Sequence, residues 1–250
     1  MKSNRLTRRE YWDDHWKTFK PKIITEKNIQ NIFPSLFKKY LPVNHKFRCL
    51  EVGCVPGDLL IALNKIFGYR PVGVDYNNKI DLIRKNMRKN GITDYKVYKA
   101  DIFKFEPKEK YDVVCSFGLI EHFSDPKPCI GKMASLVRKG GYYIVHVPNF
   151  RWLQYIIHYF SDKELFDTHN LKYMDIDNLE KVIHEVASVE TIYAGYFGII
   201  QDWPKTGFLP MDIIHYLTHG FNIIADKLGL NTLLANRYTS TDTVFIGRKL

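Results

Sequence analysis

The chain has 250 residues, of which 45% are hydrophobic and 26% charged, and it contains 15 Gly and 11 Pro. These values match an average folded domain and exclude a disordered, collagen-like or low-complexity protein. The net charge of +10 is concentrated at the start, where residues 1–50 carry 12 Lys or Arg against 4 Asp or Glu. Such a basic segment suits an anionic small molecule, a nucleic acid or an acidic membrane surface, although solubility alone also explains it.

Length, N-terminus and cysteines together predict a single cytoplasmic domain over residues 1–250. An α/β domain commonly needs about 200–250 residues. The first residues lack the apolar core of a signal peptide, and the longest uncharged run, 213–225, is too short to cross a bilayer. The four cysteines lack the paired spacing of a zinc site, so we expect reduced thiols. They are Cys49, Cys54, Cys115 and Cys129.

Residues 1–46 are predicted to form a cap of one or two amphipathic helices. Residues 47–148 then alternate short apolar runs with helix-length polar segments, which indicates βαβ units and a parallel sheet. Gly68, Gly91 and Gly140 stand where helices are expected to stop. The expected strands are 47–53, 71–75, 95–101, 111–118 and 142–149, and the expected helices are 58–68, 77–91 and 126–141.

Two insertions are expected after this core, at 149–170 and 199–236. The first is rich in aromatic residues, and the second contains a helix with apolar residues on one face: Ile213, Leu217, Phe221, Ile224 and Leu228. Between them we predict a helix over 175–187 and a strand over 187–198, and a last strand over 241–249. Aromatic residues such as Trp152 and Trp203 suggest that the insertions cover an acceptor pocket or form a dimer interface.

A strand, a glycine-rich turn and a helix follow one another directly in residues 50–60, LEVGCVPGDLL. Gly53 and Gly57 let the backbone pass close to a ligand. Asp75 ends the next predicted strand, 22 residues after Gly53, where a carboxylate can accept both hydroxyls of a ribose. These features together predict a nucleoside-binding site at the carboxyl edge of a sheet.

The glycine loop disfavours a dinucleotide. The dinucleotide pattern would need glycine at positions 55 and 58, which here are Val55 and Asp58. Asp58 would place a negative charge where a pyrophosphate must bind the start of the helix. A cofactor with one nucleoside and a cationic tail tolerates acidic groups there, and S-adenosylmethionine fits this description.

These motifs resemble the class I S-adenosylmethionine-dependent methyltransferases, small-molecule branch. The resemblance covers residues 10–150 and the closing strand. The sequence departs from the family pattern in the glycine loop, where Val55-Pro56 stands in place of the usual middle glycine. It implies a Rossmann-like α/β fold with a mostly parallel seven-stranded sheet, a late antiparallel strand and helices on both faces. The cofactor-binding residues it implies are Glu51, Gly53, Cys54, Gly57, Asp75, Tyr76, Asp101, Ile102 and Phe117, with Tyr11 and Trp16 from a first helix that folds over the cofactor.

Methyl transfer requires an acceptor held near the methyl group and, for a hydroxyl acceptor, a proton acceptor. His122 follows the fourth strand and His169 follows the first insertion, so both are candidates, with His122 preferred. His146 is predicted to be a core residue, because Val145 and Val147 flank it. No metal site is expected, since His215 and His219 share a helix without a third ligand.

The predicted activity is therefore methylation of oxygen or nitrogen of a small molecule that could be anionic, such as a sugar or a polysaccharide or secondary-metabolite precursor. The alternatives are a quinone or lipid methyltransferase in peripheral contact with a membrane, an RNA methyltransferase, and a non-catalytic binding protein on the same fold. Nucleic acid is disfavoured because the fourth-strand segment SFGLIEHF does not resemble that of the DNA amino-methyltransferases. Either a monomer or a homodimer is compatible with the sequence.

Overall fold

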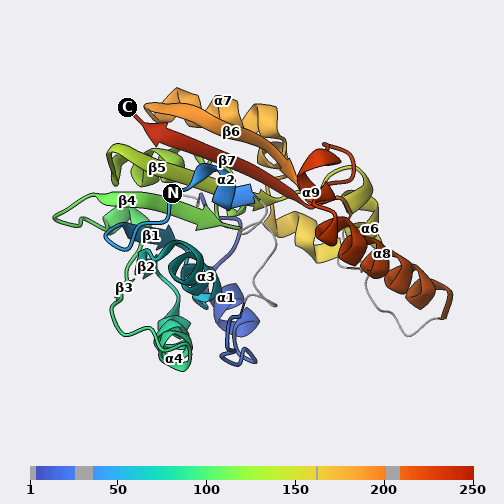
Figure 1. Cartoon of the computed structure of the whole chain (residues 1–250), viewed down its shortest axis with the longest axis horizontal. Helices are drawn as coiled ribbons and strands as arrows, with labels where there is room; N and C mark the ends of the chain where they lie inside the picture. The colour runs from blue at the N-terminus through green and yellow to red at the C-terminus, as the bar shows by residue number, and fades with distance from the viewer. Residues whose placement is uncertain (1–3, 26–35, 162, 201–208) are drawn as a thin grey trace.

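A computed structural model describes residues 4–25, 36–161, 163–200 and 209–250 (Figure 1). Its centre is a seven-stranded sheet in the order β3-β2-β1-β4-β5-β7-β6. β7 runs antiparallel to β5 and β6, and the other pairs are parallel, which confirms the predicted sheet. The strands are β1 Arg48–Val52, β2 Arg70–Asp75, β3 Lys96–Lys99, β4 Tyr111–Phe117, β5 Val137–Pro148, β6 Val189–Phe197 and β7 Asp242–Lys249.

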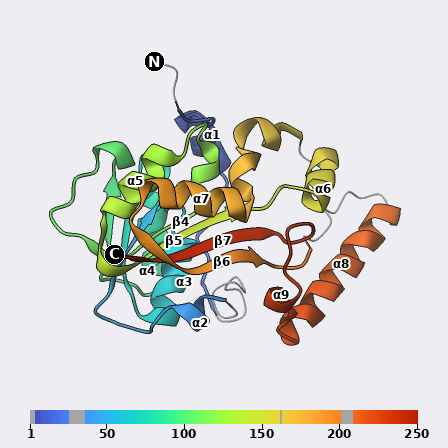
Figure 2. The ribbon, with the colours of Figure 1, turned by 90° about the horizontal axis from the view of Figure 1, so that it is seen from above.

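Helices cover both faces of this sheet (Figure 2). On one face α3 and α4 pack against the sheet together with residues around α2, and on the other face α5 and α7 do so, which gives two apolar cores. The helices are α1 Arg9–His15, α2 Lys38–Tyr40, α3 Asp58–Phe67, α4 Asp81–Lys89, α5 Lys127–Ser135, α6 Leu153–Ser161, α7 Ile176–Val186, α8 Leu209–Lys227 and α9 Leu230–Leu233. Short 3₁₀ turns are η2 Asn78–Ile80, η3 Ile102–Lys104, η4 Ile120–His122, η5 Lys163–Thr168 and η6 Leu171–Met174.

Glycines mark both ends of α3, as the sequence predicts. Gly57 precedes the helix with φ +97°, and Gly68 ends it with φ +74° while its N–H donates to the Asn64 carbonyl. Both φ values lie in the left-handed region, which glycine adopts without a steric penalty. The helix therefore starts directly at the glycine loop, and its first turn faces the carboxyl edge of β1.

The predicted helix over 126–141 was too long. α5 ends at Ser135, and Val137 already pairs with Tyr111 as the first residue of β5. Gly140 does not end a helix but lies within β5 at φ +71°, near a register shift between β4 and β5. Gly140 and Gly141 disfavour a helix here, so pairing of Val137 with β4 decides the local structure.

The helices of the two insertions, α6, α8 and α9, gather at one end of the molecule. In both views α6, α8 and α9 lie beyond the carboxyl edge of the parallel strands (Figures 1 and 2). The apolar face predicted for the second insertion lies on α8 and the residue after it, and its five side chains, from Ile213 to Leu228, are 45–67% exposed. Within the described residues, no helix combines the length and the apolar character needed to span a membrane.

The four cysteines are buried and carry free thiols. The Sγ atoms of Cys49 and Cys115 lie 3.7 Å apart, between neighbouring strands β1 and β4. Burial raises the pKa of the Cys54 and Cys115 thiols well above its usual range, so both remain protonated and unreactive. The four thiols are free, in agreement with the reduced thiols that the sequence analysis expects.

Candidate functional site

A cavity of about 650 Å³ lies at the carboxyl ends of β1, β2 and β4. Six of the eleven predicted cofactor residues line it: Gly53, Asp75, Tyr76, Ile102, Phe117 and Trp16. Sequence reasoning did not select a further set of lining residues, namely Arg5, Trp12, Val52, Val55, Val74, Asn77, Ala100, Gly118, Leu119 and Phe123. Most of these are apolar residues adjacent in the sequence to the predicted cofactor residues. The cavity wall therefore includes more residues than the sequence motifs indicate.

Asp75 ends β2 and is buried in the cavity floor. Its carboxylate accepts the backbone N–H of Val55 at 3.0 Å and that of Asn77 at 2.9 Å. Burial raises the pKa of Asp75, and these N–H donors partly offset that effect. The side chain thus ties the glycine loop to the end of the second strand.

Acidic groups crowd the start of α3. Glu51 is buried on β1, and its Oε2 atom has no hydrogen-bond partner in the described part of the chain. Burial, followed by the negative charges of Asp75 and Asp58, raises the pKa of Glu51 well above its usual range. A cationic ligand would relieve this repulsion, whereas a pyrophosphate would add to it. Glu51 itself does not line the cavity, and neither do Cys54 and Gly57.

Asp101 is bound by the N-terminal segment rather than open to the cavity. Arg5 donates to its carboxylate at 2.8 Å, and the same guanidinium lies 4.7 Å from the centre of the Tyr76 ring. The Leu6 N–H also donates to the His122 carbonyl. Arg5 belongs to a segment with several basic residues, and no local pattern distinguishes it from Arg8 or Arg9. Its place in the wall follows only from this long-range contact.

The N-terminal helix turns two tryptophans toward the cavity. Trp12 and Trp16 lie four residues apart, hence on one side of the chain as it leaves α1, and both line the cavity. Tyr11 is 39% exposed, stacks on His15 and does not line the cavity. Trp12 therefore lines the cavity where the sequence analysis expected Tyr11. Which face of α1 points to the cavity depends on how this helix docks on the rest of the chain.

The two candidate proton acceptors lie together behind the cavity rather than in its wall. The rings of His122 and His169 are 4.3 Å apart, and the Trp12 ring meets His122 edge-on at 4.8 Å. His122 is buried and its Nδ1 atom lies 2.8 Å from the Thr168 carbonyl. Burial lowers the pKa of His122 to about 3, so its imidazole is neutral at pH 7.

Glu121 completes a cluster with these histidines. One ligand-type atom from each of Glu121, His122 and His169 lies within 4.8 Å of the other two. Burial raises the pKa of Glu121 to about 8, so this carboxyl is protonated at pH 7 when no cation is near. The three residues together could hold a metal ion, which the sequence analysis did not expect.

His146 is not the core residue that the sequence analysis predicted. It lies near the end of β5, its side chain is 13% exposed, and its Nε2 atom is 2.7 Å from an Asp242 oxygen. Its ring also contacts Phe117, which lines the cavity. The flanking valines are buried as expected, but strand β7 brings a carboxylate beside the imidazole.

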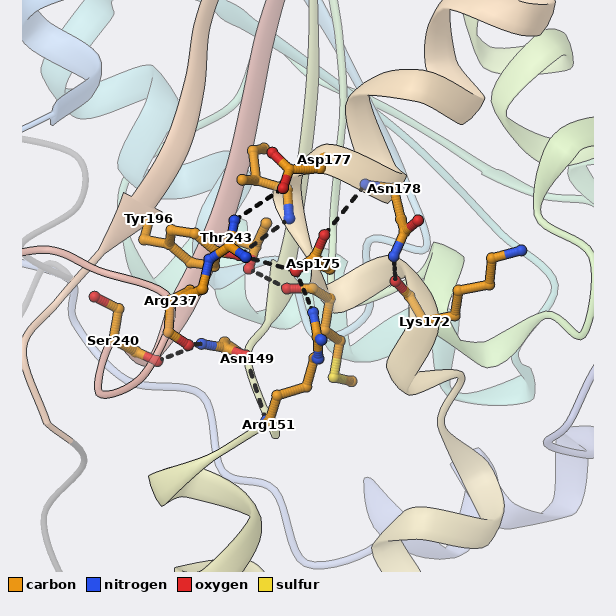
Figure 3. A network of polar contacts seen from close by, with 12 residues as sticks. Asn149, Arg151, Lys172, Asp175, Asp177, Asn178, Tyr196, Arg237, Ser240 and Thr243 are labelled. Carbon is orange, nitrogen blue, oxygen red and sulfur yellow. Dashed lines mark hydrogen bonds and ion pairs between the residues drawn. The ribbon is translucent and has the colours of Figure 1, made fainter.

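The bases of both insertions are joined by one polar network (Figure 3). Arg151 pairs with Asp175, whose other oxygen caps the start of α7 through the Asn178 N–H. Asn149 donates its amide to the carbonyl of Ser240, at the other end of the second insertion. These bonds fix both insertions at the place where the carboxyl end of β5 meets the amino end of β7.

A second, apolar hollow of about 550 Å³ lies against α8, lined by Ile199, Ile200, Leu217, Thr218, Phe221 and Thr239. Trp152, on the first insertion, is 50% exposed and contacts Tyr238, the neighbour of Thr239 in the sequence, edge-on at 5.2 Å. Trp203 lies outside the described residues, so its predicted place over an acceptor cannot be compared with the structure.

A family model described as a methyltransferase domain matches residues 44–206. The chain belongs to this methyltransferase family. The match spans the parallel strands and the glycine loop, so it includes most residues that line the cavity, whereas Arg5, Trp12 and Trp16 precede it. S-adenosylmethionine is the cofactor of this methyltransferase, as the sequence analysis predicted.

Curated relatives of this methyltransferase are ubiquinone biosynthesis O-methyltransferases. That of Bradyrhizobium sp. (strain ORS 278) is 27% identical over 112 residues, covering 44% of this chain and 43% of the relative. The mitochondrial protein of Dictyostelium discoideum is 26% identical over 118 residues, covering 43% and 37%. The matched region thus spans less than half the length of these two relatives.

Two solved structures show the same fold. A SAM-dependent methyltransferase from Archaeoglobus fulgidus has a TM-score of 0.55 at 20% identity, covering 88% of this chain and 95% of that one. Geranyl diphosphate C-methyltransferase from Streptomyces coelicolor A3(2), solved with Mg²⁺, geranyl diphosphate and S-adenosyl-L-homocysteine, has a TM-score of 0.58 at 12% identity, covering 90% and 79%.

The residues at the cavity fit S-adenosylmethionine. Asp75 offers a carboxylate for ribose hydroxyls, and a cationic tail would relieve the repulsion that this carboxylate and Asp58 exert on the nearby Glu51. Gly53 carries φ +76° beside Leu119, so a side chain there would be both strained and crowded. Apolar side chains such as Ile102 and Phe117 supply flat contact surface for an adenine.

Proposed function

We propose that this methyltransferase transfers the methyl group of S-adenosylmethionine to an oxygen atom of a small molecule with an apolar part. This proposal rests on the apolar hollow against α8, because a sugar bound there would need polar side chains as hydrogen-bond partners. The names of the relatives, which are O-methyltransferases of ubiquinone biosynthesis, support oxygen as the acceptor atom. No comparison supports the sugar acceptor that the sequence analysis favoured.

S-adenosylmethionine supplies, when bound, a methyl group on a positively charged sulfur. The residues of this chain hold it and keep water away. Asp75 accepts hydrogen bonds from the ribose, and Trp12, Trp16 and Phe117 exclude water from the cavity wall. Catalysis in such a site comes largely from holding the two reactants in line, which the fixed sheet edge provides.

The insertions 149–170 and 199–236 are proposed to bind the acceptor and determine substrate choice. Their bases are fixed to the carboxyl edge by the Arg151 and Asn149 contacts, while loops at this edge vary without disturbing the core. The exposed apolar residues of α8 offer contact area to an apolar acceptor or to the membrane that holds it. Peripheral contact with a membrane is thus part of this proposal.

A methyl-transfer assay tests the proposal directly. The full chain is incubated with S-adenosylmethionine labelled in its methyl group and with three acceptors: a prenylated catechol, a nucleotide sugar and transfer RNA. We expect transfer to the catechol oxygen, identified by mass spectrometry of the product. Transfer to the sugar or the RNA alone would contradict the proposal. Binding of S-adenosylhomocysteine without transfer to any member of a wider acceptor panel would indicate a non-catalytic binding protein.

Trp12 is expected to contribute to cofactor affinity and Tyr11 is not. Trp12→Ala removes an aromatic wall of the cavity and should raise the Kd for S-adenosylhomocysteine about tenfold, the equivalent of 1.4 kcal/mol. Tyr11→Ala, one residue away in the same helix, is the matched control and should stay within twofold. Calorimetry measures both values, and equal effects of the two substitutions would contradict the orientation of α1.

If the first insertion binds the acceptor, Trp152→Ala is expected to raise the KM for the acceptor by about three- to tenfold, since one apolar contact contributes about 1 kcal/mol. The Kd for S-adenosylhomocysteine should stay unchanged because Trp152 does not line the cofactor cavity. Light scattering on the same variant provides the control. A change from dimer to monomer with normal turnover would show that this aromatic surface serves assembly instead.

A further inference from the structure

Glu121 is the most unusual buried group in the described part of the chain. It lies on η4, directly after β4, and its side chain is 1% exposed. Neither of its carboxyl oxygens has a hydrogen-bond partner among the described residues. Buried polar groups are almost always partnered, because an unpaired one loses its hydrogen bonds to water and gains none in return. A carboxyl in this state points to a missing ligand.

The lone pair of His122 is directed into the same space. A carbonyl oxygen only accepts hydrogen bonds, so the contact between Nδ1 of His122 and the Thr168 carbonyl requires the proton on Nδ1. The Nε2 atom therefore carries a lone pair, and it lies 4.0 Å from Oε1 of Glu121. This arrangement, in which a backbone carbonyl fixes the tautomer of an imidazole, is common among metal-binding histidines.

We propose that Glu121, His122 and His169 bind one divalent transition-metal ion of the zinc type, beside the cofactor cavity. Their ligand atoms lie within 4.8 Å of one another. Neighbouring ligands of a tetrahedral zinc ion are about 3.4 Å apart, from metal–ligand distances of about 2.1 Å, so small side-chain rotations close the site. Two imidazoles and one carboxylate favour zinc, iron or cobalt over magnesium and calcium, which prefer oxygen ligands alone.

The site adjoins the cofactor cavity through two residues that line it. A Cβ atom on Gly118 would lie 3.4 Å from Oε1 of Glu121, so the carboxyl is directly behind this part of the wall. On the other side Trp12 packs its ring edge against His122. Three protein ligands leave a coordination position for an oxygen atom of water or of a bound hydroxyl, as in catalytic zinc sites.

Cobalt binding tests the proposal, because tetrahedral Co²⁺ absorbs visible light and zinc sites accept it. The full chain is treated with a chelator, dialysed and titrated with Co²⁺ and then with Zn²⁺. We expect one equivalent of Co²⁺ to give visible absorption bands that Zn²⁺ removes. Glu121→Gln and His169→Asn should each weaken Co²⁺ binding at least tenfold.

His184→Asn is the matched control, since His184 is an exposed histidine on α7 that pairs with Thr191 and Glu180. It should bind Co²⁺ like the unmodified chain. Because Glu121 is buried, its variant is checked by circular dichroism, and the part-exposed His169 provides an independent test if Glu121→Gln does not fold. No visible bands in the unmodified chain, or equal binding by all four proteins, would overturn the proposal, as would stoichiometric binding of Mg²⁺ alone.

This inference is independent of the acceptor. Calorimetry with S-adenosylhomocysteine on the same samples separates the two proposals, because Asp75 and the glycine loop bind the cofactor and do not belong to the metal cluster. Cofactor binding without Co²⁺ binding would contradict the metal site and leave the methyltransferase function intact. Co²⁺ binding without methyl transfer would support the metal site and contradict the methyltransferase function.

Discussion

Asp75→Ala is expected to raise the Kd for S-adenosylhomocysteine by about 10- to 150-fold, because it removes a charged hydrogen bond to the ribose that contributes about 1.5–3 kcal/mol. The carboxylate is buried in the cavity floor and also accepts the N–H groups of Val55 and Asn77. Alanine would therefore remove the ribose contact and release the glycine loop. Calorimetry on the purified chain measures the change.

Two further substitutions show which of these effects dominates. Asp75→Asn keeps a carbonyl oxygen for one backbone donor but removes the charge, so it should lie between the unmodified chain and Asp75→Ala. Asp81→Ala is the control, since Asp81 starts α4, is exposed and pairs with Arg84. An unchanged Kd in a folded Asp75→Ala protein would rule out the ribose contact. Saturable binding of NAD with no response to S-adenosylhomocysteine would overturn the cofactor assignment itself.

His122→Ala is expected to lower kcat by about 10²- to 10⁴-fold while the Kd for S-adenosylhomocysteine stays within a few-fold. The sequence analysis placed His122 as a proton acceptor after the fourth strand, but burial lowers its pKa to about 3, so its imidazole is a weak base. The loss should therefore come mainly from the proposed metal site, since the Nε2 atom of His122 lies near Glu121 and its ring near that of His169. Both roles place the imidazole beside the cavity but outside the cofactor-contacting wall. Steady-state kinetics with the methylated acceptor measures the loss.

His169→Ala separates the two roles. If His122 is a metal ligand, removal of His169 should cost a comparable factor in kcat, and both variants should lose bound Co²⁺. If His122 acts only as a proton acceptor, His169→Ala should retain most of its activity. His184→Ala, on the exposed side of α7, controls for the loss of a histidine as such. A kcat for His122→Ala within threefold of the unmodified chain would contradict both roles.

The sequence by itself determined the order of strands and helices and most of the cofactor loop. These features depend on residues close together in the chain. Gly53 and Gly57 specify the turn by their left-handed φ values, and Asp75 follows directly from the end of a strand. Parallel strands bring their carboxyl ends to one edge, so the cavity could be placed before any contact was known.

Only the tertiary structure decided which side chains meet across long separations. Arg5 reaches Asp101 over 96 residues, and His146 meets Asp242 over the same separation. Periodicity carries no information about such pairs, because it reports which face of an element is apolar and not what docks there. The same reason explains why Trp12 rather than Tyr11 lines the cavity.

The cluster of Glu121, His122 and His169 shows both contributions together. Two of its members are adjacent in the sequence, and their place after the fourth strand was predicted. The third member, His169, lies 47 residues after His122, directly after η5. The N–H of the next residue, Asn170, donates to the Glu121 carbonyl and holds this segment beside the cluster. The sequence therefore determined which residues stand at the edge of the sheet. Packing of the segment after β5 decided that a carboxyl and two imidazoles share one buried space, because that contact depends on where a distant segment docks.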